Sequence, residues 1–204
     1  MTNQKIAKSY GFVLATICFI FISCGDDGGT TPKPRGYPRL VFPERGYQKF
    51  SENYCTFTFD FPKYAVIEQD KLFFDEAPPS DCWFNIKIPS LNAIIYCSYY
   101  DISAKNKFDK LRNDAFTLVG KHDIKADYIE ERPFRNAQGV GGFLFDIQGP
   151  AACPFQFYMT DSTRHFMRGA LYFNARAQPD SLAPVVQFLK TDLQRMLETF
   201  TWKN

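Results

Sequence analysis

Alternating apolar and polar side chains predict β-strands along most of the chain after residue 37. Several short runs place hydrophobic residues at every second position, the spacing that puts them on one face of a strand. These runs are residues 55–61, 83–88, 93–100, 143–147, 155–160 and 165–173. The polar segment 161–164 separates the last two, so we expect these two strands to form a hairpin.

Two segments follow a helical period instead. The first covers about 106–121, and Gly120 near its end is expected to be its C-terminal cap. The second covers about 181–200, with Ser181 as the expected N-terminal cap and Pro184 in the first turn. The apolar faces consist of Phe108, Leu111, Ala115, Leu118 and Val119 in the first helix, and Leu182, Val185, Val186, Leu189, Leu193, Met196, Leu197 and Phe200 in the second.

The order of these elements favours an α+β fold. Strands come first, then one helix, more strands and a terminal helix, so strands and helices do not alternate as a doubly wound parallel sheet requires. A mostly antiparallel sheet covered by two main helices fits this order better. The segment 37–204, about 165 residues, is long enough for one hydrophobic core, and we predict a single domain there.

The N-terminus has the pattern of a lipoprotein signal sequence. Lys5 and Lys8 precede an uncharged apolar stretch, residues 11–22, that ends close to Cys24. At roughly a dozen residues, this stretch is shorter than the ~20 of a transmembrane helix. We expect residues 1–23 to be a cleavable signal peptide. Cys24 would then be lipidated, with palmitate as the expected acyl chain, and would anchor the protein to a membrane of the cell envelope, exposed to the periplasm. An ordinary secreted protein or an uncleaved anchor is the alternative.

A polar linker follows the predicted lipidation site. Residues 25–36 contain no apolar side chain except prolines, so we expect residues 24–36 to be the lipidated cysteine and a flexible tether of roughly 20 Å reach. Asp26 and Asp27 are a candidate sorting signal, and the choice between inner and outer membrane stays open.

Charge argues against binding to nucleic acid. Loss of the signal peptide leaves 22 of the 24 basic residues against 22 acidic ones, so the mature chain is formally neutral. Nucleic-acid binding relies on a basic stripe that displaces counterions, and no run of Lys or Arg supplies one.

Four cysteines remain in the predicted domain, which is the number expected for two disulfides in an exported protein. Four cysteines permit three pairings, and sequence alone does not choose between them. Cys55 and Cys82 each share the core-facing phase of the strand that follows, which favours a Cys55–Cys82 bond and leaves Cys97 with Cys153. The alternative is that some of the four are free buried thiols.

The sequence offers few groups for catalysis or metal binding. His122 and His165 are the only histidines, and no Cys-x-x-Cys, His-x-x-x-His or compact carboxylate loop is present. Asp161, Ser162 and His165 lie within five residues of each other, whereas the members of a catalytic triad come from separated elements. We therefore expect a turn followed by a strand histidine, no metal, no cofactor and no enzymatic activity.

Two further segments have simple structural interpretations. The glycines of 139–142 precede a strand, so a turn fits them better than a phosphate-binding loop, which follows a strand. The charged cluster at 130–135 surrounds Pro133, and we expect a solvated loop there. Aromatic residues make up 17% of the chain, and exposed rings at Tyr99, Tyr100 or between residues 37 and 54 would offer a surface for protein or sugar partners.

Several segments carry a recognisable family pattern, namely residues 33–39, 82–86, the segment from 127 onward, 154–173 and 180–185, with Thr160-Asp-Ser-Thr and Arg168-Gly-Ala-Leu-Tyr-Phe as the most specific motifs. In these segments the chain resembles the gliding motility lipoprotein GldD family of Bacteroidota-type bacteria. The resemblance covers essentially the whole mature chain. It implies a cell-envelope lipoprotein required for gliding and for the linked type IX secretion machinery, lipidated at Cys24, with no enzymatic activity assigned. The opening motif 57–62, the antiparallel sheet and the long C-terminal helix are also similar to PsbP-like folds.

These observations lead to two hypotheses. The first is a non-catalytic envelope lipoprotein that supports the gliding and secretion apparatus through contacts with its other proteins. The possible contact surface consists of Asp161, Ser162, Thr163, Arg164, His165 and Arg168. The alternative is a lipoprotein that binds an envelope glycan such as peptidoglycan through exposed aromatic side chains.

Overall fold

The computed structural model describes residues 39–203 except 73–75 and 176–177, so the predicted signal peptide, Cys24 and tether lie outside the described residues. Most strands belong to one antiparallel sheet. They are β3 (Val66–Gln69), β4 (Phe84–Ile88), β5 (Ala93–Asp101), β6 (Tyr128–Arg135), β7 (Gly141–Gln148), β8 (Phe155–Thr160) and β9 (His165–Phe173), in the spatial order β3-β4-β5-β9-β8-β7-β6. The predicted hairpin is confirmed, because β8 and β9 pair antiparallel from Phe155 opposite Leu171 to Thr160 opposite Phe166.

A smaller sheet and two helices complete the described residues. The smaller sheet has the order β1-β2-β10 and contains β1 (Tyr47–Phe50), β2 (Phe57–Pro62) and β10 (Thr201–Trp202). The helices are α2 (Phe108–Gly120) and α3 (Pro179–Thr199), and a short 3₁₀ turn, η1 (Pro89–Leu91), joins β4 to β5.

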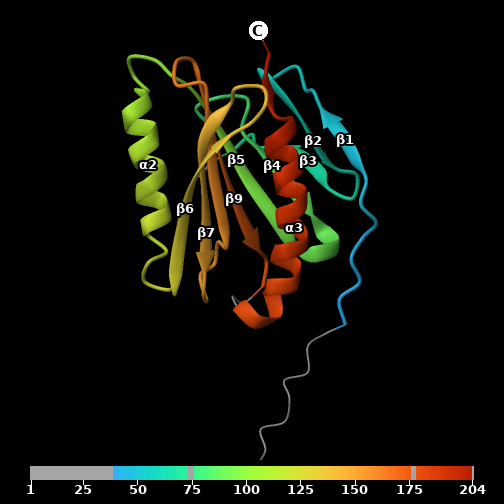
Figure 1. The fold of residues 1–204 in the computed structure, drawn as a ribbon. Coiled ribbons are helices and arrows are strands. Elements are labelled where there is room, and N and C mark those ends of the chain that lie inside the picture. Colours follow the sequence, from blue (N-terminus) through green and yellow to red (C-terminus); the bar gives the residue numbers. More distant parts are fainter. Residues whose placement is uncertain (1–38, 73–75, 176–177, 204) are drawn as a thin grey trace, which may run out of the picture. The chain divides into compact units, whose positions relative to one another are not determined.

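Two hydrophobic cores lie on opposite faces of the large sheet. In β8, Phe157 faces the core shared with α3 and β2, while its neighbour Tyr158 faces the core shared with α2. Alternating positions of a strand point to opposite faces, so α2 and α3 cover different sides (Figure 1). The predicted fold class, a mostly antiparallel sheet covered by two helices, is confirmed.

The six predicted strands are present, but the charged segment around Pro133 is not a solvated loop. It forms β6, which pairs with β7 at the edge of the sheet. An edge strand tolerates proline and charge because one row of its backbone groups has no partner strand and one of its sides meets solvent. The predicted turn at 139–142 is shorter than expected, since Gly139 has a φ of +80° while Gly141 and Gly142 already belong to β7.

The helix boundaries differ from the predicted caps. α3 begins at Pro179, after Gln178, so Ser181 is not its cap and Pro184 lies inside the helix. A proline in the first helical position loses no intrahelical hydrogen bond, which favours the earlier start. Gly120 is the last residue of α2, and the capping residue is Lys121 in right-handed helical geometry.

The segment that leads out of the predicted tether is fixed onto α3. Asp192 of α3 is 3% exposed and accepts hydrogen bonds from the hydroxyls of Tyr47, at 2.7 Å, and Tyr64. Arg45 contributes an ion pair, with 3.4 Å between its Nε and Oδ1 of Asp192. Buried carboxylates are stable only when paired and hydrogen-bonded, as this one is. The first described segment of the domain is therefore held against α3 by Arg45 and Tyr47.

Candidate functional site

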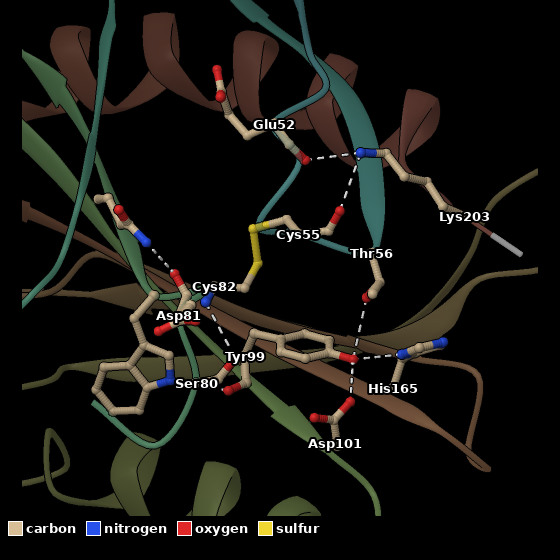
Figure 2. Close-up of a disulfide and its surroundings, with 12 residues drawn as sticks. Glu52, Cys55, Thr56, Ser80, Asp81, Cys82, Tyr99, Asp101, His165 and Lys203 are labelled. Carbon is tan, nitrogen blue, oxygen red and sulfur yellow. Dashed lines mark hydrogen bonds between the residues drawn. A yellow bond between two sulfur atoms is a disulfide. The ribbon is translucent and has the colours of Figure 1, made fainter. Parts of the chain in front are cut away.

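A disulfide joins Cys55, just before β2, to Cys82, just before β4 (Figure 2). The two Cα atoms are 5.1 Å apart, within the usual range for a bridge. This bond agrees with the pairing favoured by strand phase. It connects the small sheet to the large one.

The predicted bond between Cys97 and Cys153 is not formed, and both residues are free buried thiols. Cys97 lies on β5 and belongs to the core on the α3 face. The Cys153 sulfur instead neighbours the side chains of Gln156, Arg168 and Tyr172. These side chains occupy the alternate positions, on the α2 face of the sheet, so the two sulfurs point to opposite sides.

A polar network lies beside the disulfide, and its Tyr99 and His165 are buried while its Thr56 and Asp101 are exposed. Figure 2 shows the Tyr99 hydroxyl at its centre, 2.7 Å from Oδ1 of Asp101 and 2.6 Å from Nδ1 of His165. Thr56 donates a third hydrogen bond, at 3.2 Å. A phenol has one proton to donate, and the Tyr99 hydroxyl donates it to Asp101. The Tyr99 oxygen must then accept from His165, which requires the ring tautomer with a hydrogen on Nδ1. Burial raises the pKa of Tyr99 above its ordinary value, so the hydroxyl stays protonated.

The C-terminal strand closes over this network. The Trp202 ring stacks on His165 with 4.9 Å between ring centres, and Lys203 donates to the backbone carbonyls of Glu52 and Cys55. His165 is only 8% exposed. Its ring is held by Tyr99 and Trp202 and is not directed at Ser162, so Asp161, Ser162 and His165 do not form a triad.

The turn between β8 and β9 is ordered by Asp161. Its Oδ1 accepts hydrogen bonds from the backbone N–H groups of Thr163, Arg164 and His165, at 2.7 to 2.9 Å. Burial alone would raise the pKa of Asp161, but these three donors lower it below its ordinary value. Ser162 has a left-handed φ of +66°, and Ser162, Thr163 and Arg164 are exposed.

The six residues of the predicted contact surface are therefore not on one surface. Asp161, Ser162, Thr163 and Arg164 form the turn, while His165 is buried under Trp202. Arg168 lies at an alternate position of β9, on the α2 face, and donates to Gln156. Of the six residues, only Ser162, Thr163 and Arg164 of the turn are exposed, so the turn 161–164 is the part that stays a candidate contact surface.

Cavities border this turn and helix α3. One of about 640 Å³ is lined by Phe108, Arg135, Phe143, Asp161 and Ser162, among others. A larger one of about 860 Å³ lies between α3 and the edge strand β6. Both are of a size that suits a ligand or an inserted side chain.

Exposed aromatic side chains do not gather where the sequence suggested. Tyr99 is 3% exposed and belongs to the core. Tyr96 of β5, Tyr128 of β6 and Phe42 in the segment before β1 are the large aromatic residues that the described residues expose, so they come from three separate parts of the chain. Strand phase alone could have identified Tyr99 as internal, since it shares the parity of Cys97.

Within the described ranges, no three His, Cys, Asp or Glu side chains are grouped as metal ligands. No helix of that part of the chain is both long and apolar enough to cross a bilayer.

The fold and its disulfide define a class of protein, a disulfide-bonded α+β domain with an antiparallel sheet covered by two helices. The chain belongs to the gliding motility lipoprotein GldD family, whose sequence model matches residues 27–202. It is thus a member of a membrane-anchored cell-envelope lipoprotein family. No curated protein matches the chain. Among solved structures, it is similar to cyanobacterial PsbP (CyanoP) from Synechocystis sp. PCC 6803, with 12% identity, a TM-score of 0.43, and coverage of 82% of this chain and 98% of that one.

Proposed function

We propose that this protein is a non-catalytic envelope lipoprotein that supports gliding motility and the linked type IX secretion machinery through protein contacts. The family match over residues 27–202 is the observation that carries the proposal. Cys24 would hold the lipid, and residues 25–36 would let the domain stand off the membrane. The domain would face the periplasm, with no cofactor.

The surroundings of the histidines support a structural rather than a catalytic use of these residues. His165 is enclosed by Tyr99 and Trp202. His122 is half-buried, and burial together with nearby Arg168 lowers its pKa, which favours the neutral ring. A general base needs a reachable nucleophile within hydrogen-bond distance. His165 contacts the Tyr99 hydroxyl and the Trp202 ring, and the His122 ring neighbours the Tyr172 ring.

The turn 161–164 is the contact surface that the geometry supports best. Its neighbour His165 stacks on Trp202 of the C-terminal strand β10, so the turn lies at the same end of the domain as this strand. In Figure 1 the blue segment that begins at residue 39 starts at the opposite end. A tethered domain would then present the turn and the adjoining 640 Å³ cavity away from its attachment.

A deletion strain tests the function. It would be complemented with the wild type or with Cys24→Ala, and spreading motility and the secreted proteome would be measured. We expect both activities to fail without the protein and to return only with the lipidated form. Normal motility and secretion in the deletion strain would refute the proposal.

Paired charge reversals test the surface. Arg164 in the turn has a 66% exposed side chain, and Lys125 is also exposed but lies in the α2–β6 loop. We expect Arg164→Glu to reduce motility and Lys125→Glu to leave it intact, with equal melting temperatures. A photocrosslinking residue at position 162, but not at 125, should capture a protein of the apparatus. Equal activity and equal crosslinking would exclude the turn as the contact surface.

A further inference from the structure

A run of exposed apolar side chains lies at the start of the described domain. Leu40, Val41 and Phe42 are 37%, 78% and 37% exposed. Arg39, which precedes the run, is exposed as well. Single apolar side chains are common on protein surfaces, but three exposed ones in succession are unusual unless they contact something. The run therefore indicates a partner that offers an apolar environment.

This run is fixed to helix α3. The Phe42 ring stacks on Phe188 with 4.6 Å between ring centres. The guanidinium carbon of Arg45 lies 4.2 Å from the centre of the same Phe188 ring, and Arg45 also donates to the backbone carbonyl of Phe188. The same guanidinium pairs with the buried carboxylate of Asp192. A partner that binds Val41 would therefore orient the whole domain.

Two more exposed apolar side chains lie at this end of the domain. Ile124, 87% exposed, is in the loop between α2 and β6, and Tyr128, 59% exposed, is the first residue of β6. In Figure 1 this loop, the first turn of α3 and the start of the blue segment all lie at the lower end. The turn 161–164 lies at the upper end, and its exposed residues are polar or charged. The lower end is thus the one that suits an apolar partner.

The charge of the adjoining sequence suits a membrane surface. Residues 28–43 contain Lys33, Arg35 and Arg39 and no acidic residue. Anionic phospholipid headgroups attract Lys and Arg that are held near the bilayer surface. Apolar side chains next to basic ones are typical of segments that lie in the interface of a bilayer. Charge and exposed apolar surface therefore indicate the same kind of partner.

The proposed lipid anchor brings such a surface within reach. Only residues 25–38 separate Cys24 from Arg39, and the tether has a reach of roughly 20 Å. A short flexible link gives a binding surface an effective concentration of about the millimolar range at its target. Contacts from a few side chains are then sufficient. The tether that lets the domain stand off the membrane also lets this end return to it.

We propose that residues 39–42, together with Ile124 and Tyr128, form a docking face that rests on an anionic phospholipid bilayer. Val41 enters the headgroup region of the bilayer, and Arg39 pairs with lipid phosphates. In the docked position the turn 161–164 points away from the membrane. This inference rests on the proposed lipidation of Cys24, but not on the role of the protein in motility.

Binding to vesicles tests the face without the anchor. The mature chain with Cys24→Ser would be sedimented with vesicles of phosphatidylethanolamine and phosphatidylglycerol, or of phosphatidylcholine alone. We expect at least about tenfold weaker binding to phosphatidylcholine, because the attraction to the basic residues is lost. Val41→Asp should weaken binding to the anionic vesicles by a similar factor, since a charge is costly to remove from water.

Leu72→Asp is the matched control for Val41→Asp. Leu72 is 69% exposed and lies beyond the end of β3, in the segment that leads towards Cys82 at the other end of the domain. The variant makes the same change of charge at an exposed apolar residue, so it should bind the anionic vesicles like the wild type. Equal melting temperatures of the two variants would confirm that neither change affects folding.

A tryptophan at position 41 measures the contact in the anchored protein. The Cys24 thiol would be coupled to a maleimide phospholipid in the anionic vesicles, since the cysteines of the described residues are bonded or buried. Brominated lipid quenches an indole that reaches the acyl chains. After subtraction of the wild-type fluorescence, we expect Val41→Trp to be quenched at least about twofold more than Thr163→Trp, which lies in the turn at the opposite end.

Equal quenching at positions 41 and 163, or equal vesicle binding of Val41→Asp and Leu72→Asp, would overturn the proposal. Neither assay measures motility. Failure of the docking face would therefore leave the proposed function standing, and normal motility of a deletion strain would leave the docking face standing.

Discussion

The Tyr99 hydroxyl lies 2.6 Å from Nδ1 of His165, inside the junction where β5, β9 and the C-terminal strand meet. Because the same oxygen also contacts Asp101 and Thr56, one phenol satisfies three polar groups. The Trp202 ring of β10 packs against both Tyr99 and His165, so the junction holds this strand against the large sheet.

Tyr99→Phe should therefore destabilise the domain. The variant keeps the ring but leaves His165 without its partner, and an unsatisfied buried polar group costs about 1–3 kcal/mol. Urea unfolding would measure the loss. Tyr96→Phe is the matched control, since Tyr96 is 48% exposed, and it should change the free energy of unfolding by less than about 0.5 kcal/mol. Equal stability of the two variants would contradict a structural network at Tyr99.

The single bridge in the described residues gives a second prediction. The bonded cysteines are 27 residues apart, and closing a loop of that size stabilises a protein by about 3–4 kcal/mol in the chain-entropy description. The double variant Cys55→Ala/Cys82→Ala should lower the melting temperature to that of the reduced wild type. Maleimide labelling of the mature domain should find Cys97 and Cys153 only after unfolding. Labelling of neither cysteine in denatured, unreduced protein would reveal a second bridge.

Two adjacent glycines allow a test of strand packing. A Cβ on Gly142 would lie 1.9 Å from the carbonyl oxygen of Tyr158, a backbone atom that cannot move aside, whereas one on Gly141 would meet its nearest atom at 3.8 Å. We expect Gly142→Ala to cost more than about 3 kcal/mol, the range of severe core disruption, and Gly141→Ala to be nearly neutral. Similar circular dichroism melts for both variants would be inconsistent with the β7–β8 pairing.

Strand phase explains which cysteine pairing the sequence could predict. Cys55 and Cys82 each precede a strand whose buried residues share their parity, and both strands face the same core. The alternation of side chains within one strand does not show whether a side chain of another segment points to the same face of the sheet. The predicted Cys97–Cys153 bond is therefore wrong, because Cys153 lies outside a strand and its sulfur is on the α2 face of the sheet, whereas the Cys97 side chain is on the α3 face.

The remainder of the site depends on contacts between distant segments. Tyr99, His165 and Trp202 come from three strands whose neighbours are set by the topology, so no local pattern brings them together. The sequence did not predict β6 because its charged residues outnumber its hydrophobic ones. This segment is a strand because it pairs with β7, and a local pattern does not reveal that pairing. Hydrophobic periodicity, in contrast, located both helices to within about two residues of their ends, the usual uncertainty of such boundaries.

The turn carries a pH-dependent contribution to stability. Three backbone N–H groups lower the pKa of Asp161 in the folded state below its value of about 3.9 in an unfolded chain. A carboxylate with a depressed folded pKa stabilises the protein above its unfolded pKa, and this stabilisation is lost as the pH falls through the folded value. Asp161→Asn retains an acceptor but removes the charge.

The wild type should therefore exceed Asp161→Asn in free energy of unfolding by about 1–2 kcal/mol at pH 7, as for hydrogen bonds to a charged group. The difference should shrink as the pH falls below about 4, where the unfolded carboxyl group becomes protonated, and should vanish once the folded one is protonated too. Asp109→Asn provides the control, because the Asp109 side chain is 78% exposed, and its small effect should vary little over the same range. Urea unfolding at each pH measures both differences. A gap between wild type and Asp161→Asn that stays constant from pH 7 to pH 2 would mean that the Asp161 charge does not stabilise the turn.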